Sequence, residues 1–491
     1  MSLLKLRKVL VSDKIANDCL EAFKGKGVEV TYKPGLSKTE LLDIIPEYNG
    51  IIVRSATKVT ADVIKAAVNL EIIGRAGTGT DNIDQAAASD AGVVVMNTPG
   101  GNTNSAAEHT CALIMAMCRN LANRHTELMN GEWNRINGIE LSGKTVGIIG
   151  LGRIGMIVAH RMQAFGMKTV GYDPFVTAAA AAEKGVEFLQ LEDMWPVCDF
   201  LTIHVPLLPS TKHMMNSAVF DKCKKGVRIV NCARGGIIDE EALLENLNSG
   251  KVACAALDVF EKEPPSADSP LLQHSNLIAT PHLGASTAEA QTRVAKEIAE
   301  QFLALRDGKS TFGCLNAPLL RGALSQPVKA KLAQQLGMLL YTLNPKADVL
   351  TVQGDDESFV PYAVMAGYLN AKGISAANLI SIKKVADVNG LSFQYTATSE
   401  DLTVECGDVK LSGRFDGVTS FLTKVNSVST NIPLAGSVTV VRSGTALYNQ
   451  LPSLSGHVTG VHFAGDVTIL SHSGKTLESD KLETLGTVAL C

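Results

Sequence analysis

The alternation of short apolar segments with helix-length stretches constrains the fold of this chain more than any other feature. Two series of segments are rich in Val and Ile: the first occupies residues 7–13, 28–35, 50–55, 70–77 and 92–99, and the second occupies residues 144–150, 168–174, 200–207, 227–235, 254–260 and 276–284. Buried strands that alternate with helices form parallel sheets with both faces covered. The sequence therefore predicts an α/β protein with two doubly wound parallel-sheet domains, and the six strands of the second series suit a dinucleotide-binding domain.

The segments between and after these two series complete the expected outline. A helix is predicted from about Asn104 to Asn130, and a long amphipathic helix is predicted between Ser286 as its cap and Gly308 as its stop. Beyond residue 309, Ser, Thr and Gly become more frequent and alternating strands appear, as in residues 402–417. Because 491 residues are too many for a single hydrophobic core, we expect a C-terminal α+β extension attached to the two α/β domains.

Charge and hydropathy exclude several classes of function. The chain carries 45 Lys and Arg against 49 Asp and Glu, so it has no basic surplus for binding nucleic acid or an anionic membrane. No apolar run approaches the ~20 residues of a membrane helix, and Lys5, Arg7 and Lys8 interrupt the segment where a signal peptide needs its apolar core. The ten cysteines include no CxxC pair. We therefore expect a cytoplasmic protein with reduced thiols and no metal site.

The strongest local motif is the segment VGIIGLGRIG, which contains Gly150, Gly152 and Gly155 directly after a buried strand. These glycines permit a tight turn, close approach of a pyrophosphate to the backbone, and close packing of the following helix on the strand. The next strand ends at Asp173, near the distance at which a carboxylate binds a ribose hydroxyl. Such a carboxylate repels a 2′-phosphate, so the motif predicts binding of NAD rather than NADP. The alternative is a glycine turn with a surface aspartate.

Three further segments place reactive side chains after strands of the same domain. NCARGG contains Arg234, DVFEKEPP contains Asp258, Glu261 and Glu263, and TPHLGAS contains His282. Taken singly, each has an ordinary structural explanation: a helix-capping arginine, a solvated acidic turn, and a structural histidine. Together they supply what oxidation of a 2-hydroxy acid needs, namely a base for the hydroxyl proton, a cation for the carboxylate and a group that orients the base.

These motifs resemble those of the D-isomer-specific 2-hydroxy acid dehydrogenases. The resemblance rests on the segments VRSATKVT, GRAGTGTDNID, NTPGGNTNSAAE, LGRIG, CKKGVRIVNCARGG, ALDVF, EPP and TPHLGAS, and it extends from about residue 5 to about residue 320. It implies a discontinuous, flavodoxin-like substrate-binding domain from residues 1–99 and 285–308, and a Rossmann NAD-binding domain from residues 100–284, with a cleft between them.

The resemblance also implies roles for individual residues. His282 is the expected acid/base, Glu263 orients it, and Arg234 binds the substrate carboxylate and polarises the C2 oxygen. The residues implied in NAD binding, besides the three glycines and Asp173, are Thr78, Arg153, Ile154, Pro206, Cys232, Ala233, Arg234, Asp258, His282, Gly284 and Ala285. One departure lies in TIHVPL, where Val205 replaces a threonine of the family, so only a backbone contact can survive at that position.

The class of substrate is predicted from arginines at strand ends, because a phosphorylated substrate needs positively charged side chains in its pocket. Arg54 and Arg75 end the third and fourth strands, and Asn102 begins the connection after the fifth; all three resemble substrate-site residues of the family members that oxidise 3-phosphoglycerate. Arg135 is expected to reach the site of a neighbouring subunit. The expected reaction is NAD-dependent oxidation of 3-phosphoglycerate to 3-phosphooxypyruvate, the first step of the phosphorylated pathway to serine. Two alternatives are a glyoxylate or hydroxypyruvate reductase, and an NAD(H)-sensing protein-binding scaffold of the same fold.

The C-terminal third resembles the long form of this family. Residues 371–399 are similar to its intervening domain, which we place at residues 309–450, and residues 451–491 form a short or degenerate module of the regulatory type. His457, His462 and His472 lack neighbouring cysteine or carboxylate ligands and are interpreted as structural or exposed. The expected partners are a small phosphorylated 2-hydroxy acid and further copies of this chain, in a dimer or tetramer, with no nucleic acid and no membrane.

Overall fold

The computed structural model describes residues 4–374, 377–417, 419–434, 437–442, 458–464, 467–472 and 484–489. Its contacts divide the chain into two compact units, residues 1–98 with 295–491 and residues 99–294. The boundary at residue 295 falls inside a single long helix, α12 (Ala288–Arg306). The two units are described separately below.

The first unit begins with a five-stranded parallel sheet in the order β2-β1-β3-β4-β5. Its strands are β1 (Lys8–Val11), β2 (Glu29–Tyr32), β3 (Gly50–Val53), β4 (Ile72–Arg75) and β5 (Val94–Asn97). Every residue of β3 and β5 is buried, as expected for strands with helices on both faces. This order is the flavodoxin-like one, which confirms the predicted fold class.

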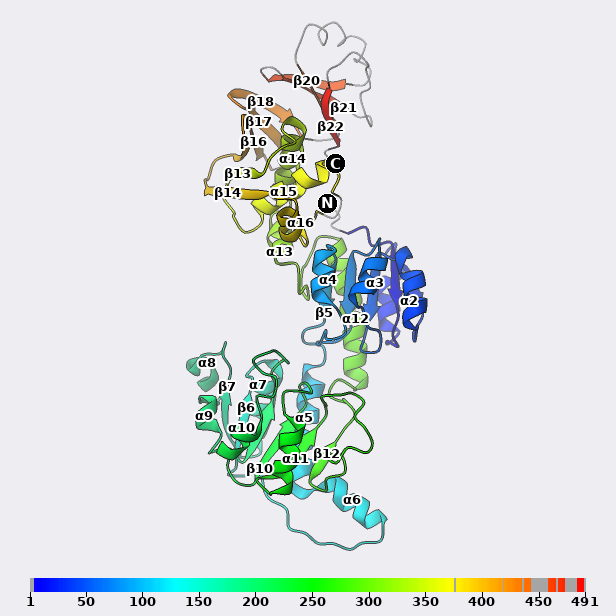
Figure 1. Cartoon of the computed structure of the whole chain (residues 1–491), viewed down its shortest axis with the longest axis vertical. Helices are drawn as coiled ribbons and strands as arrows, with labels where there is room; N and C mark the ends of the chain where they lie inside the picture. Colours follow the sequence, from blue (N-terminus) through cyan, green and yellow to red (C-terminus); the bar gives the residue numbers. More distant parts are fainter. Residues whose placement is uncertain are drawn as a thin grey trace. The chain divides into compact units, whose positions relative to one another are not determined.

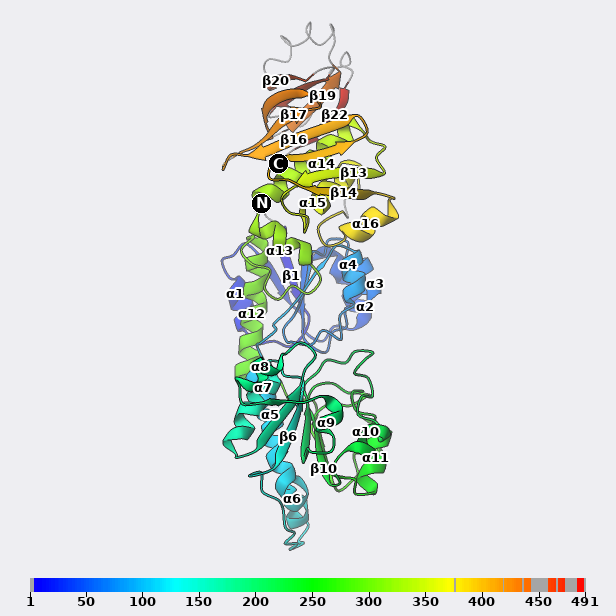
Figure 2. The same ribbon diagram turned by 90° about the vertical axis from the view of Figure 1, so that its left-hand side faces the viewer.

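Helices cover both faces of this sheet, as Figure 2 shows, with α1 and α12 on one side and α2, α3 and α4 on the other. The bounds are α1 (Asp18–Phe23), α2 (Lys38–Ile44), the short 3₁₀ helix η1 (Ile45–Glu47), α3 (Ala61–Ala66) and α4 (Gln85–Asp90). Helix α12 packs closely because Gly74 leaves room for it: a Cβ at Gly74 would lie 2.4 Å from the Phe302 ring. Phe302 also meets Phe23 of α1 edge to face, with ring centroids 6.5 Å apart.

The second unit contains a seven-stranded parallel sheet in the order β12-β11-β10-β9-β6-β7-β8. Its strands are β6 (Thr145–Ile149), β7 (Lys168–Tyr172), β8 (Glu187–Phe188), β9 (Phe200–Ile203), β10 (Val227–Asn231), β11 (Val252–Leu257) and β12 (Leu277–Ala279). The strand order reverses beside β6, which is where ligands bind in doubly wound sheets. The six predicted strands are all present, and the two-residue β8 is an addition that no apolar run announces.

The helices of this unit lie on both faces of its sheet (Figures 1 and 2), with α5 and α7 on one face and α10 and α11 on the other. The bounds are α5 (Thr103–Arg119), α6 (Leu121–Met129), α7 (Arg153–Ala164), α8 (Ala178–Ala182), α9 (Leu191–Met194), α10 (Ser217–Lys222) and α11 (Glu240–Asn248). The single helix predicted from about Asn104 to Asn130 is wrong in one respect. Asn120 adopts a left-handed conformation with φ +47°, which ends α5 and starts α6.

The C-terminal extension adds helices and two further sheets. Its helices are α13 (Pro318–Ser325), α14 (Pro327–Leu343), α15 (Val360–Ala371) and α16 (Ile382–Val388). The six-stranded sheet has the order β14-β13-β15-β16-β17-β18. Its strands are β13 (Val349–Gly354), β14 (Ser392–Ala397), β15 (Leu402–Cys406), β16 (Val409–Phe415), β17 (Ser420–Val425) and β18 (Val428–Pro433). The four-stranded sheet contains β19 (Ser437–Arg442), β20 (Val458–Ala464), β21 (Val467–His472) and β22 (Thr484–Ala489). This extension is the α+β part predicted from the change in composition.

Two glycines allow α14 and α15 to pack closely. A Cβ at Gly337 would lie 2.0 Å from the carbonyl oxygen of Val364, and a Cβ at Gly367 would lie 2.0 Å from that of Gln334. The extension also contacts the region of the first sheet, since Nδ2 of the Asn378 side chain donates to the carbonyl oxygen of Gly92 over 2.9 Å. Much of the predicted module at 451–491 lies outside the described residues, as does His457; the side chains of His462 and His472 are likewise not described.

Two global expectations concern membranes and thiols. Within the described part of the chain, no helix is both long and apolar enough to cross a membrane. The nine cysteines that the structure describes are all free thiols, and seven of them are buried. Burial raises the pKa of the Cys19 and Cys198 thiols to about 12, so these two are protonated packing groups rather than reactive thiolates.

Candidate active site in the seven-stranded unit

The glycine turn after β6 is built to receive a phosphate group. Gly150 has φ +99°, and a Cβ there would lie 2.6 Å from the carbonyl oxygen of His204. A Cβ at Gly155 would lie 2.0 Å from the carbonyl oxygen of Gly150, so helix α7 can approach the turn this closely only because residue 155 is glycine. A Cβ built on Gly152 would have no other heavy atom within 4 Å, so the space in front of this residue is open. Gly152 is also the N-cap of α7, and no side chain caps this end of the helix. The first amides of α7 are therefore available to a pyrophosphate, as the NAD assignment requires.

Asp173 at the end of β7 is fixed to this glycine turn. Its Oδ2 accepts a hydrogen bond from the Leu151 amide over 2.9 Å, and its Oδ1 accepts one from the Phe175 amide over 2.8 Å. Each carboxylate oxygen has further lone pairs, so the group can still accept hydrogen bonds from a ribose. The fold thus ties the ribose-binding candidate to the pyrophosphate-binding candidate through one backbone amide.

His204 follows β9 beside the glycine turn, and its ring nitrogen Nε2 lies 3.0 Å from the Thr202 hydroxyl. Burial lowers the pKa of His204 to about 4, so the ring is neutral near pH 7. The neighbouring Val205 side chain would lie 3.0 Å from a Cβ at Gly150, which places this departure from the family pattern against the glycine turn. Pro206 uses its carbonyl oxygen to accept from the Thr211 hydroxyl over 2.7 Å.

The predicted acid/base pair is in contact. The Nδ1 atom of His282 lies 2.8 Å from Oε2 of Glu263, and the other oxygen, Oε1, accepts from the Phe260 amide over 3.1 Å. His282 has φ +54°, a conformation that residues other than glycine rarely adopt. Strained backbone of this kind persists only where the surroundings hold it in place, and it is concentrated at functional sites. The His282 side chain is 48% exposed, so a substrate can reach its second nitrogen.

Asp258 holds the turn that carries His282. This carboxylate is fully buried, and its Oδ1 accepts from the Leu283 amide over 2.7 Å while its Oδ2 accepts from the Gly284 amide over 2.8 Å. The hydroxyl of Thr280 donates to Oδ1 over 2.6 Å. Burial by itself raises the pKa of Asp258, but these hydrogen bonds and the one from His109 outweigh it and lower the pKa below its ordinary value. The carboxylate is therefore ionised and engaged mainly with the protein.

His109 on α5 is a member of this network that sequence reasoning missed. Its Nε2 lies 3.2 Å from Oδ1 of Asp258 and 3.1 Å from the Thr280 hydroxyl. His109, Asp258 and Cys232 each offer one atom of a type that can bind a metal, and these three atoms lie within 4.8 Å of one another. This is the only such cluster among the described residues. Burial raises the pKa of Cys232 to about 12. A metal would need the thiolate form of Cys232, and the Asp258 carboxylate already accepts hydrogen bonds from several protein groups. These three groups therefore suit a hydrogen-bonded network better than a metal site.

Arg234 lies on a turn that Asn231 and Gly235 shape. The Asn231 side chain accepts from the Ala233 amide over 2.9 Å and donates to the Arg234 carbonyl over 2.8 Å. A Cβ at Gly235 would lie 1.8 Å from the carbonyl oxygen of Phe260. The loop that carries Arg234 therefore packs backbone to backbone against the loop that carries Glu263. The predicted Ala285 also contributes a carbonyl, which accepts from Nε2 of the Gln291 side chain over 3.1 Å.

The two arginines of the five-stranded sheet end neighbouring strands, since Val53 pairs with Arg75 and Arg54 follows. Asn82 connects them: it accepts from Nε of Arg75 over 3.1 Å and donates to the Arg54 carbonyl over 2.8 Å. Burial lowers the pKa of Arg54, against the opposing effect of Asp13, and the guanidinium remains charged near pH 7. Asn82 lies inside the quoted GRAGTGTDNID segment, but sequence alone gave it no role.

The remaining predicted residues are placed as follows. Thr78 donates through its hydroxyl to the Thr98 carbonyl over 3.3 Å. Asn102 is the N-cap of α5, and Arg153 and Ile154 are the first two residues of α7. Arg135 is exposed in the irregular stretch after α6. The structure therefore brings Arg234, Glu263 and His282 onto adjoining loops of the second unit, whereas Arg54, Arg75 and Thr78 belong to the first.

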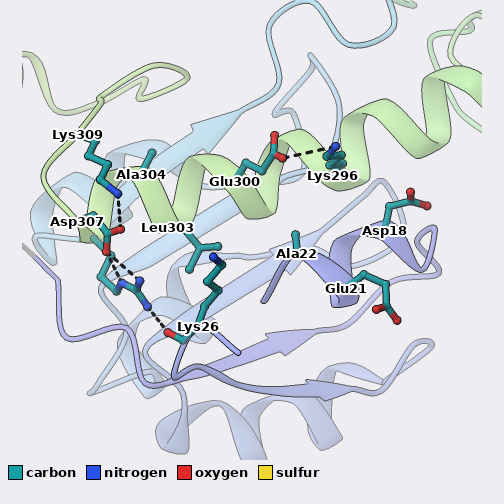
Figure 3. Close-up of a pocket in the computed structure, with 11 residues that line it drawn as sticks. Asp18, Glu21, Ala22, Lys26, Lys296, Glu300, Leu303, Ala304, Asp307 and Lys309 are labelled. Atoms are coloured by element: carbon teal, nitrogen blue, oxygen red, sulfur yellow. Dashed lines mark hydrogen bonds and ion pairs between the residues drawn. The ribbon is translucent and has the colours of Figure 1, made fainter. Parts of the chain in front are cut away.

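A surface cavity of about 580 Å³ lies between α1 and the end of α12, away from all of these residues (Figure 3). Two ion pairs lie along its lining: Lys296 with Glu300 over 3.8 Å, and Lys309 with Asp307 over 3.1 Å. Both pairs are exposed, and ion pairs of this kind contribute little to stability. None of the site residues predicted from the sequence lines this cavity.

Comparison with known proteins agrees with this geometry. Residues 111–284 match the NAD-binding domain of D-isomer specific 2-hydroxyacid dehydrogenases. The chain is 49% identical over 404 residues to D-3-phosphoglycerate dehydrogenase of Rattus norvegicus, covering 80% of this chain and 76% of that one. It is 41% identical over 419 residues to D-3-phosphoglycerate dehydrogenase of Bacillus subtilis, covering 83% and 79%. Among solved structures, D-lactate dehydrogenase of Aquifex aeolicus with NAD and lactic acid matches with a TM-score of 0.56 and 28% identity, covering 61% and 96%.

Proposed function

The chain belongs to the D-isomer specific 2-hydroxyacid dehydrogenase family, and from this premise we propose that it is an NAD-dependent oxidoreductase that oxidises 3-phosphoglycerate to 3-phosphooxypyruvate. This is the first reaction of the phosphorylated pathway to serine. The observation that carries the proposal is the high identity to D-3-phosphoglycerate dehydrogenases from a mammal and a bacterium, extending over four fifths of the chain. The contact between His282 and Glu263 supports it chemically.

The residues present fit NAD. The uncapped start of α7 suits the pyrophosphate, and the carboxylate of Asp173 suits an unphosphorylated ribose. When bound, NAD⁺ supplies the acceptor for the hydride that leaves C2 of the substrate. We assign the nicotinamide side to Cys232, Ala233, Gly284 and Ala285, with Thr78, Arg153, Ile154 and Pro206 as further contacts.

We propose that His282 removes the hydroxyl proton during oxidation. The Nδ1 atom faces Glu263, so the tautomer that donates Nδ1–H to this carboxylate leaves a lone pair on Nε2 for the substrate. Glu263 fixes the direction of the ring and stabilises the imidazolium that forms when the proton arrives. Proton transfer of this kind typically accelerates a reaction by ~10²–10⁴-fold.

We assign the anionic groups of the substrate to arginines. Arg234 is proposed to bind the carboxylate and polarise the C2 oxygen, because a guanidinium matches a carboxylate with two parallel hydrogen bonds. Arg54 and Arg75, held in register by Asn82, are proposed to bind the phosphate, together with Asn102. Arg135 is proposed to act in the site of a neighbouring subunit.

The domain boundaries and the assembly are also proposals. We place the substrate-binding domain at residues 1–99 and 285–308, the NAD-binding domain at 100–284, and the further domains at 309–450 and 451–491.

A homo-oligomer is supported by an apolar surface on α6 and the stretch after it, where Leu128, Met129 and Trp133 are 55%, 73% and 80% exposed. A purified chain that sediments as a monomer would contradict this. We also propose a cytoplasmic location.

The decisive experiment compares substrates. The purified chain is mixed with NAD⁺ and either 3-phosphoglycerate, glycerate, D-lactate or 2-hydroxyglutarate, and NADH formation is followed by absorbance. A strong preference for 3-phosphoglycerate is expected. Comparable rates with the unphosphorylated acids would favour a glyoxylate or hydroxypyruvate reductase, and tight NADH binding without turnover would favour a sensing scaffold.

A further inference from the structure

Glu263 is a partly exposed side chain, although its proposed role requires a fixed position. The side chain is 38% exposed; it accepts a hydrogen bond from the Phe260 amide and contacts Nδ1 of His282. A side chain so exposed loses its orientation unless the backbone that carries it is fixed. The loop from Phe260 to Glu263 therefore needs an anchor elsewhere in the fold.

Two other glutamates provide such an anchor by binding each other's backbone. The Glu261 amide donates to Oε1 of Glu240 over 2.6 Å, and the Glu240 amide donates to Oε1 of Glu261 over 3.3 Å. Glu240 is the first residue of α11, so its amide has no acceptor within the helix. A carboxylate at this end of a helix is also favoured by the helix dipole. The pair thus joins the loop of Glu263 to the start of α11.

A histidine supports the same pair from a third segment. The Nε2 atom of His213 lies 3.1 Å from Oε1 of Glu261, and its Nδ1 lies 3.9 Å from Oδ2 of Asp239. Asp239 caps α11 by accepting from the Ala242 amide over 3.1 Å. His213 itself has φ +49° and is held through its amide, which donates to the Gly236 carbonyl over 2.8 Å. The loops that carry Arg234 and Glu263 and the start of α11 are therefore linked.

The charges in this cluster interact with the acid/base pair. The ionisable groups around Glu240 are Glu261, Glu263 and His213, and Asp239 and His282 complete the set. Burial raises the pKa of Glu240, and the negative charges of Glu261 and Glu263 also raise it, against the opposing effects of the hydrogen bond from the Glu261 amide and of His213. Glu240 is thus close enough to Glu263 to sense its charge.

We propose that Glu240 and Glu261, supported by His213, are positioning residues that hold the carboxylate of Glu263 against Nδ1 of His282. Glu240 and Glu261 do not touch the reacting atoms; they act by fixing the loop between Phe260 and Glu263. The inference deepens the proposed function, because it rests on His282 being the acid/base. It predicts that the acceptor oxygen of Glu240 matters more than its charge.

The kinetic test uses three variants of the full-length enzyme. Glu240→Ala removes the acceptor, Glu240→Gln keeps an acceptor oxygen without the charge, and Glu241→Ala is the matched control, since Glu241 is the exposed next residue of the same helical turn. We expect Glu240→Ala to lower kcat about tenfold, a part of the ~10²–10⁴-fold that acid/base assistance provides, with little change in KM. Glu240→Gln is expected to recover most of kcat, and Glu241→Ala to behave as wild type.

The spectroscopic test does not depend on turnover. In ¹⁵N-histidine-labelled enzyme, the His282 signals, assigned with His282→Gln, report which ring nitrogen carries the proton. We expect the Nδ1–H form in the wild type, in Glu240→Gln and in Glu241→Ala, and a mixture of tautomers in Glu240→Ala, as in Glu263→Gln. If Glu240→Ala keeps both kcat and the Nδ1–H form, the positioning role is wrong. If the wild type lacks turnover but shows these tautomer changes, the proposed function fails while the positioning role stands.

Discussion

Gly235 and Phe260 lie so close that not even a Cβ atom fits between them: built on Gly235, it would be 1.8 Å from the Phe260 carbonyl oxygen. These residues belong to the loops after β10 and β11, which carry Arg234 and Glu263. The spacing between two proposed catalytic groups therefore depends on the absence of a side chain next to one of them.

The variant Gly235→Ala is expected to disturb both loops. Overpacking of a close contact typically costs about 1–3 kcal/mol of the free energy of unfolding, and the displacement of Glu263 from His282 adds a loss of kcat. Urea denaturation and initial-rate measurements on the same preparation test the two effects. An unchanged denaturation midpoint together with an unchanged kcat would show that the two loops are not coupled.

Asp173 is expected to control the choice between NAD and NADP. In Asp173→Ala the repulsion of a 2′-phosphate is removed, and so is the acceptor for the Leu151 and Phe175 amides. The ratio of kcat/KM for NAD⁺ to that for NADP⁺ should fall at least about tenfold, the scale of a lost charge-assisted contact. Asp173→Asn is the matched control, since it removes the charge but keeps an oxygen acceptor. An unchanged ratio in both variants would contradict the ribose assignment.

Asn82 is expected to act through the arginines that it connects. Asn82→Ala removes the acceptor of the Arg75 guanidinium and the donor to the Arg54 carbonyl. We expect KM for 3-phosphoglycerate to rise about five- to tenfold, corresponding to about one hydrogen bond of ~1 kcal/mol, with KM for NAD⁺ unchanged.

Arg54→Ala should raise KM for the phosphorylated acid more than for an unphosphorylated analogue. Equal effects on both acids would mean that these residues do not serve the phosphate.

His204 is expected to make the stability of the protein depend on pH in mildly acidic solution. Its folded-state pKa of about 4 lies below the ordinary value of 6.5, so between these values the unfolded chain binds a proton that the folded chain does not. Stability therefore falls as the pH drops from 6.5 towards 4. Relative to His204→Gln, the wild type should lose roughly 1–3 kcal/mol of unfolding free energy across this window. Urea unfolding of both proteins at several pH values checks this; parallel curves would contradict it.

Much of the architecture could be predicted because it is encoded locally. Runs of Val and Ile between helical stretches indicate parallel strands, and a glycine turn after the first strand of the second series indicates where α7 begins. The same local logic placed Arg234 and His282 after strands. It failed where a single backbone angle decides the outcome, as at Asn120, whose left-handed conformation divides the predicted helix.

The fold class, the glycine turn and the identity of the reactive side chains could be predicted without a structure, because each depends on residues that are neighbours along the chain. The partners that those side chains contact became visible only in the folded protein. His109 reaches Asp258 across 149 positions, and Glu240 reaches Glu261 across 21. Such contacts depend on the order of strands in the sheet and on loops meeting at its carboxyl edge, and no local pattern of residues specifies which loop lies beside which.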